Sequence, residues 1–257
     1  MNSRVRLDNP FRRTRLFIST YDAMHPPTIR TFLDASTRRF PVWMQGWGQT
    51  ETGPLTFRFH TRGSMAADRG ERPTTRDLGR PVPGKTRLRV VDPVTFEPVR
   101  RGEAGLVLAR TRARCLDYPG ETERWRRKDA AGWWNTGDIA IRTRTGRVLL
   151  LDREVDHAPR LSCLQVEDVL EDRLTEAQEC VLLTRPGTDP LPVVVTAGGN
   201  LPRTSWRAAA RGLPLMADPV AMTWDEVPRT GTGKVQRKTL LQQLTGRSET
   251  CGSGAWT

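Results

Sequence analysis

The chain has 257 residues, of which 37% are hydrophobic, and it contains 22 Gly. This length and composition exclude a mostly disordered chain and suit one large or two modest domains. The formal charge is +12, but of the 41 basic residues 37 are arginines spread along the chain. Scattered charge is typical of solvated surface, so we expect no nucleic-acid partner.

The sequence carries no signal for export, a membrane or a metal cage. The N-terminus lacks an apolar h-region, and apolar stretches such as residues 148–151 have only the length of a strand. No CxxC pair occurs, and the widely spaced cysteines are Cys115, Cys163, Cys180 and Cys251. We therefore expect a cytoplasmic protein with reduced thiols, no membrane span and no zinc site.

The first 75 residues predict a β-α-β unit. Residues 15–20 and 41–45 are typical of strands, and residues 28–39 have the apolar spacing of a helix. Such units build parallel sheets, in which two strands do not suffice. We therefore interpret residues 1–75 as the end of a larger α/β subdomain.

Three further parts follow. Residues 76–152 predict a small, barrel-like β-rich subdomain, because short strands at 87–91, 105–109 and 147–151 alternate with Pro and Gly turns. Residues 153–245 predict a two-layer α+β module, with helices at 164–174, 205–211 and 237–244 and strands at 180–184 and 192–196. The tail 246–257 is predicted to be disordered. The fold class is thus α+β / α/β.

The first motif with chemical potential is QGWGQTETG at residues 45–53, after the second predicted strand. Ligands of open α/β sheets bind at the carboxyl ends of strands, and Gly46 allows close backbone approach. The indole of Trp47 offers a flat face. Thr50 offers a hydroxyl for a phosphate, and Glu51 offers a hard oxygen for Mg²⁺. The alternative is a glycine-rich turn with an incidental acid.

The second motif is GWWNTGD at residues 132–138. A carboxylate after a tight Thr-Gly turn is placed to accept two hydrogen bonds from a ribose diol. The alternative is a β-turn in which Asp138 caps its own backbone.

The third motif is PRTGTGK at residues 228–234. A P-loop would need glycine at position 228, where Pro228 stands, so that interpretation is excluded. Two interpretations are left: a flexible glycine loop that presents Lys234 to an active site built elsewhere, and a basic surface turn.

Together the motifs have the order and spacing of one family, and the chain resembles the adenylate-forming superfamily of acyl-CoA synthetases, luciferases and peptide-synthetase adenylation domains. WGQTETG is similar to its YGxTE motif, WWNTGD to its xxTGD motif and PRTGTGK to its C-terminal lysine motif. Supporting stretches are GRPVPG at 79–84, VDP at 91–93, GEAG at 102–105 and the Asp152-Arg153 pair.

The resemblance implies that ATP activates a carboxylic acid, fatty or aryl, as an acyl-adenylate. The acyl group of this adenylate then passes to the thiol of coenzyme A or of a carrier protein. It places Trp47 and Gly46 against the adenine and Thr50 at the α-phosphate. It makes Glu51 the ligand of Mg²⁺. By the same resemblance Asp138 binds the ribose hydroxyls with the help of Arg153, and Lys234 bridges carboxylate and ribose oxygens as the catalytic lysine of a mobile module.

The sequence also departs from the family pattern. No Ser/Thr/Gly-rich phosphate loop precedes Trp47, Val155 stands where the hinge has Asp or Lys, and Leu106 replaces a second Glu of a GExGE pattern. The resemblance thus covers about the C-terminal half of a typical member. We expect an enzyme that is incomplete without its phosphate loop, or one that needs a separate N-terminal-half polypeptide. The alternative is a non-catalytic remnant or partner subunit.

Overall fold

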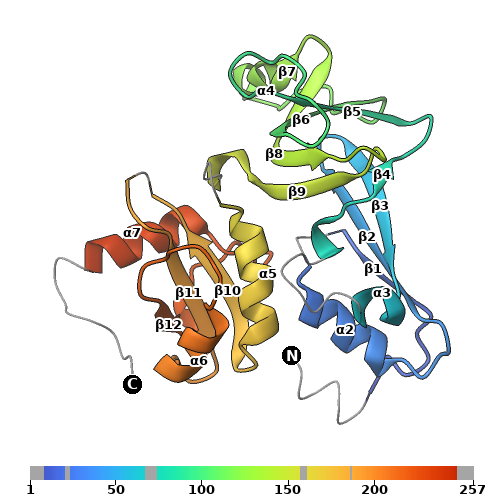
Figure 1. Ribbon diagram of the computed structural model, residues 1–257. Coiled ribbons are helices and arrows are strands. Elements are labelled where there is room, and N and C mark those ends of the chain that lie inside the picture. The colour runs from blue at the N-terminus through green and yellow to red at the C-terminus, as the bar shows by residue number, and fades with distance from the viewer. Residues whose placement is uncertain (1–8, 21–23, 67–73, 157–160, 186, 248–257) are drawn as a thin grey trace. The chain divides into compact units, whose positions relative to one another are not determined.

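The computed structural model describes residues 9–20, 24–66, 74–156, 161–185 and 187–247 (Figure 1). The chain forms two compact units, Met1–Val155 and Asp156–Thr257. The division falls just after the predicted boundary at Asp152-Arg153. Each unit has its own sheets and core, as expected when few contacts cross a boundary.

The first unit opens with a four-stranded mixed sheet of order β1-β2-β3-β4. Its strands are β1 (Leu16–Ser19), β2 (Val42–Gln49), β3 (Gly53–His60) and β4 (Arg80–Pro81). Strands β1 and β2 are parallel and are joined through helix α2 (Pro26–Ala35), which confirms the predicted β-α-β unit. The prediction of only two strands was wrong, because β2 continues through the glycines and turns back into β3.

Helix α2 covers one face of this sheet and leaves the other face exposed. Its residues Ile29 and Leu33 are fully buried, together with Phe17 and Trp43 of the sheet and Met65 of helix α3 (Arg62–Ala66). On the other face, cross-strand pairing aligns Ile18, Met44 and Phe59 in one row. Ile18 is 59% exposed and Phe59 is 55% exposed, so this row is not part of the core.

A five-stranded antiparallel sheet, shaped as a half-barrel, forms the rest of the first unit and confirms the predicted β-rich part. Its strands are β5 (Thr86–Val91), β6 (Ala104–Thr111), β7 (Asp129–Ala130), β8 (Trp133–Arg142) and β9 (Val148–Arg153). The sequence reading missed helix α4 (Thr122–Lys128), which precedes β7. A 3-10 turn, η1 (Thr74–Arg76), precedes this sheet, and η2 (Glu154–Asp156) follows it.

The second unit has three layers, so the predicted two-layer arrangement was wrong. Its strands β10 (Ala177–Leu183), β11 (Leu191–Thr196) and β12 (Val220–Met222) form one sheet. Helices α5 (Cys163–Arg173) and α6 (Arg203–Ala209) pack on one face through Leu182 and Val194. Helix α7 (Arg237–Arg247) packs on the other face through Val193 and Val195. The continuous apolar run of β11 is the pattern of a strand buried on both faces, so the sequence held a signal for the second helical layer that the two-layer prediction overlooked.

The predicted tail begins too early, because Gly246 belongs to α7, and residues 248–257 lie outside the described part of the chain. Within the described residues, none of the helices has the length and apolarity needed to cross a membrane. Cys115, Cys163 and Cys180 form no disulfide bond in the described part of the chain, and Cys251 lies outside that part.

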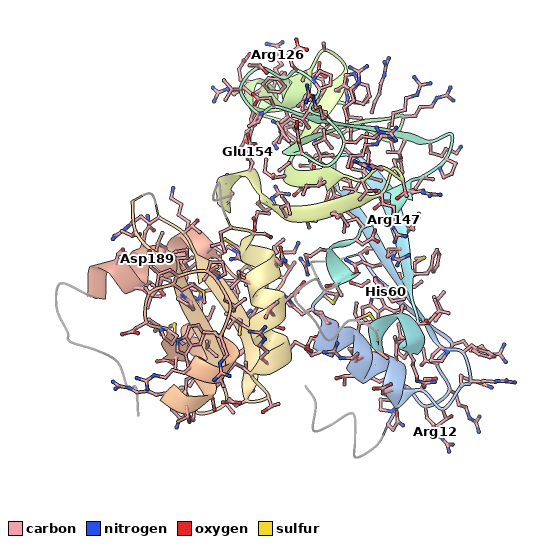
Figure 2. The ribbon with its side chains drawn as sticks, viewed as in Figure 1. Arg12, His60, Arg126, Arg147, Glu154 and Asp189 are labelled. Atoms are coloured by element: carbon pink, nitrogen blue, oxygen red, sulfur yellow. The ribbon has the colours of Figure 1, made fainter. Side chains whose placement is uncertain are left out.

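His60 is a buried titratable group at the end of β3, and it gives the first unit a pH-dependent stability (Figure 2). Its side chain is 0% exposed, and neither ring nitrogen has a hydrogen-bond partner among the described residues. Burial, the largest cause, and the cations of Arg58 and Arg147 together lower the pKa of His60 to about 4, against the opposing effect of Asp77. The native state therefore holds His60 as the neutral imidazole.

We expect the free energy of unfolding to fall as the pH falls from 7 to 5. The unfolded imidazole takes up a proton near pH 6.5 whereas the native one does so only near 4, so the unfolded state holds more protons in this range. The linked loss is about 2 kcal/mol between pH 7 and pH 5. Urea unfolding of the wild type and of His60→Leu at both pH values measures it. Equal pH dependence of the two proteins would contradict the assignment.

Candidate functional site

The first motif forms a hairpin and not, as predicted, a loop beyond the end of a parallel strand. Gly46, Trp47 and Gly48 belong to β2, and residues 50–52 form the turn before β3. A Cβ at position 48 would lie 2.2 Å from the Gly53 oxygen, so this close approach of the two strands requires glycine. The hairpin leaves Trp47 half-buried and Thr50 exposed.

The second motif lies inside β8 and not in the predicted tight turn. The pairing of β6 with β8 shifts between Leu106 and Leu108, and this bulge accommodates Thr136, Gly137 and Asp138. Thr136 Oγ1 donates to the Val107 oxygen at 2.8 Å and accepts from the Asp138 N–H at 3.2 Å. Gly137 has a φ of +69°, a backbone conformation that favours glycine. Bulges of this kind redirect a side chain.

Gln49 joins the two motifs. Its Nε2 donates to the Thr136 oxygen at 2.5 Å and to Asp138 Oδ2 at 3.3 Å. Its Oε1 accepts from the indole N–H of the fully buried Trp134 at 3.2 Å. One amide therefore fixes the hairpin turn against the bulge, two segments almost ninety residues apart in the chain.

Asp138 is buried and paired with Arg153, its neighbour across β8 and β9. Arg153 Nη1 donates to Asp138 Oδ1 at 2.8 Å, and the Arg153 side chain is 51% exposed whereas that of Asp138 is 4% exposed. Burial raises the pKa of Asp138, and the charge and hydrogen bond of Arg153 oppose this rise. The predicted pair is thus present, with the cation at the surface and the carboxylate beneath it.

Glu51 is held by a tyrosine that sequence reasoning missed. The Tyr118 hydroxyl donates to Glu51 Oε1 at 2.6 Å, and the Cys115 N–H donates to the Glu51 backbone oxygen at 2.7 Å. Burial and then Glu51 raise the pKa of Tyr118, so the phenol keeps its proton. No motif marks Tyr118 in the sequence, because the loop that carries it reaches Glu51 only through tertiary contacts.

The lysine motif lies in the second unit and forms a hydrogen-bonded hairpin, not the flexible loop expected. The Thr230 N–H donates to the Lys234 oxygen at 2.8 Å, and Arg229 Nη1 donates to the Gly233 oxygen at 3.1 Å. The guanidinium carbon of Arg229 also lies 3.5 Å from the centre of the Trp224 ring, and Arg229 Nη2 forms an ion pair with Glu179 Oε2 at 2.5 Å. The hairpin therefore presents Lys234 on a fixed support.

The structure thus brings together predicted residues of the first unit: the hairpin carries Gly46, Trp47, Thr50 and Glu51, and Gln49 links it to Asp138 and Arg153. Lys234 belongs to the other unit. A hollow of about 570 Å³ in the first unit is lined by none of these residues; four arginines contribute to it, Arg80, Arg87, Arg89 and Arg142. The candidate site therefore rests on the side-chain network and not on this hollow. Within the described residues, no cluster of three or more potential metal ligands occurs.

Comparison with known proteins agrees with this architecture. Residues 4–118 match the family model described as AMP-binding enzyme. The chain is 41% identical over 249 residues to a 3-amino-2-hydroxy-4-methoxybenzoate diazotase of Streptomyces cremeus, covering 96% of this chain and 44% of that protein. It is 26% identical to a 2-methylpropanoate–CoA ligase of Humulus lupulus, covering 89% of this chain and 44% of that protein.

Solved structures show the same fold. The amide bond synthetase McbA of Marinactinospora thermotolerans superposes with a TM-score of 0.68 at 23% identity, covering 91% of this chain and 46% of that one. The chain therefore belongs to the adenylate-forming superfamily of AMP-binding enzymes. It spans 44% of the length of the two curated relatives described.

Proposed function

We propose that this chain takes part in the ATP-dependent activation of a carboxylic acid as its acyl-adenylate. The observation that carries the proposal is the Gln49 bridge, which holds the WGQTETG hairpin against the TGD bulge. The two motifs that in this superfamily face the nucleotide are thereby at one place in the first unit. Membership of an AMP-binding family supports the same chemistry.

The residues at this place suit a nucleotide in their chemistry. Trp47 offers a half-buried indole to the adenine, and the exposed Thr50 offers a hydroxyl to the α-phosphate. Asp138 has one hydrogen bond to each carboxylate oxygen, which leaves acceptor capacity for ribose hydroxyls.

The residues present suit a Mg²⁺ ion that is shared between the protein and the substrate phosphates, and not one that is held by protein ligands alone. Glu51 is half-buried and already accepts from Tyr118, and the described residues hold no cluster of three or more potential metal ligands. Mg²⁺ commonly binds through one or two carboxylates together with substrate phosphates and water. In this role Glu51 would hold the ion, and the ion would neutralise negative charge that develops on the phosphates.

Lys234 would supply a cation to the reacting groups. Attack of a carboxylate on a phosphorus builds negative charge, and a positioned ammonium stabilises that charge. The acceptor of the acyl group follows as a proposal: the thiol of coenzyme A or of a carrier protein. The diazotase among the similar proteins, whose name gives an aminobenzoate as its substrate, favours testing amino-substituted aryl acids.

We expect the purified chain to exchange pyrophosphate into ATP in the presence of Mg²⁺ and its acid, tested over fatty, aryl and aminoaryl acids. Lys234→Ala is expected to slow this exchange about a hundredfold or more, because it removes charge stabilisation in the transition state. Lys238→Ala, which removes an exposed lysine four residues later, is the matched control and should retain the rate. Absence of exchange with every acid would contradict an autonomous enzyme.

The second candidate is a subunit that acts together with another polypeptide. The exposed row of Ile18, Met44 and Phe59 favours it, since such apolar surface is commonly covered by a partner. This candidate predicts that the chain binds AMP but does not exchange pyrophosphate by itself. Exchange by the isolated chain at a rate that Lys234→Ala reduces would exclude it.

A further inference from the structure

Lys128 is a cation that the three motifs do not account for. It is the last residue of α4 and one of only four lysines in the chain. Its Nζ donates to the Asn135 backbone oxygen at 3.3 Å and lies 6.0 Å from the centre of the buried Trp134 ring. The side chain is half-buried, and its hydrogen bond to Asn135 places the ammonium group beside the TGD bulge.

Gly137 leaves a small space between two cations. A Cβ added to Gly137 would lie 3.4 Å from Arg153 Nη2 and 3.5 Å from Lys128 Nζ. Both nitrogens therefore flank the same point above the glycine, which no side chain fills. Arg153 uses its other terminal nitrogen, Nη1, to bind Asp138, so Nη2 faces this point.

The electrostatics of this place favour an anion. Burial lowers the pKa of Lys128, and the nearby charge of Arg153 lowers it further, while Glu51, Glu154 and Asp138 oppose the shift. Two cations at one point repel each other, and an oxyanion between them would remove that repulsion and gain two charge-assisted hydrogen bonds.

We propose that Lys128 and Arg153 hold an anionic oxygen over Gly137, and that a phosphate of the bound nucleotide supplies this oxygen. The inference rests on the proposed nucleotide site and deepens it, because it adds a phosphate-binding cation from α4. A nucleoside without phosphate makes no use of it.

The test compares AMP with adenosine by isothermal titration calorimetry. The wild type is expected to bind AMP more tightly than adenosine. Lys128→Met should weaken AMP binding about tenfold or more and leave adenosine binding unchanged, because it removes a charged hydrogen bond to the phosphate alone. Lys128→Arg should recover most of the AMP affinity. Gly137→Ala should weaken AMP binding with the cation still present, because its methyl group fills the space.

Arg127→Met is the matched control, since it removes an exposed cation from the same helical turn and should bind AMP as the wild type does. Wild-type AMP affinity in Lys128→Met would overturn the inference alone. An equal loss of affinity for AMP and for adenosine in that variant would also overturn the inference, because the substitution would then act through the fold. A wild type that binds neither compound would overturn the proposed function and this inference with it.

Discussion

Replacement of Trp134 by alanine is expected to destabilise the first unit by about 3–5 kcal/mol, the usual cost of removing a large buried aromatic side chain. Trp134 is 0% exposed and packs against Tyr118 and Trp125, with ring centroids 6.0 Å and 6.3 Å away. Its loss also leaves Gln49 without its N–H donor, and Gln49 holds the bulge that carries Asp138. Urea unfolding followed by circular dichroism measures the change.

Trp134→Phe separates packing from hydrogen bonding. It keeps most of the buried ring but removes the N–H, so we expect a smaller cost of about 1–3 kcal/mol from the unsatisfied Gln49 oxygen. AMP binding should weaken in both variants, because Gln49 then no longer positions the bulge. A Trp134→Ala protein as stable as the wild type would contradict the burial of this side chain.

Replacement of Arg237 by alanine is expected to destabilise the second unit by about 3–5 kcal/mol, because it leaves a buried carboxylate without its counter-ion. Arg237 Nη1 and Nη2 donate to the two oxygens of Glu167 at 2.7 Å and 2.9 Å, and the Glu167 side chain is only 1% exposed. Hydrogen exchange detected by mass spectrometry measures the loss separately in each unit.

The location of this ion pair explains the size of the effect. Glu167 Oε1 also accepts from the Leu182 N–H at 2.7 Å, and Glu171 accepts from the Cys180 N–H at 2.9 Å, so the two glutamates of α5 satisfy the free edge of β10. Arg237 in turn donates to the Leu182 oxygen at 3.0 Å. Loss of Arg237 therefore loosens the edge strand and the start of α7 together.

Arg207→Ala serves as the control for Arg237→Ala, since Arg207 is an exposed cation of the same unit. In Arg237→Ala we expect faster hydrogen exchange over residues 177–183 and unchanged hydrogen exchange in the first unit. Because Arg237 follows Lys234 by three residues, the variant should also reduce pyrophosphate exchange. If the protection of β10 against hydrogen exchange did not change, the ion pair of Arg237 with Glu167 would not support this edge strand.

The fold was predictable where a local pattern had one meaning. The helical spacing of Ile29, Phe32 and Leu33 identified α2, and a short β-rich run between Pro and Gly turns identified β5, in which Leu88 and Val90 are buried. The three-layer second unit was missed, although the continuous apolar run at 193–195 is the pattern of a strand buried on both faces.

The site was predictable in its motifs but not in its contacts. Trp47, Glu51, Asp138 and Lys234 stood out by residue type and spacing, and the resemblance placed Arg153 beside Asp138 as a helper in ribose binding, whereas the structure shows the two as an ion pair. Gln49, Tyr118 and Lys128 were not selected, since each acts through a residue far away in the chain.

The sequence by itself determined the superfamily, because the three motifs and their order can be recognised without knowledge of tertiary contacts. It also showed that the +12 charge comes from arginines spread along the chain. Only the tertiary structure decided which side chains surround Asp138 and Glu51. Burial and pairing depend on strand register, and the β8 bulge changes that register at the TGD motif in a way that sequence spacing does not record.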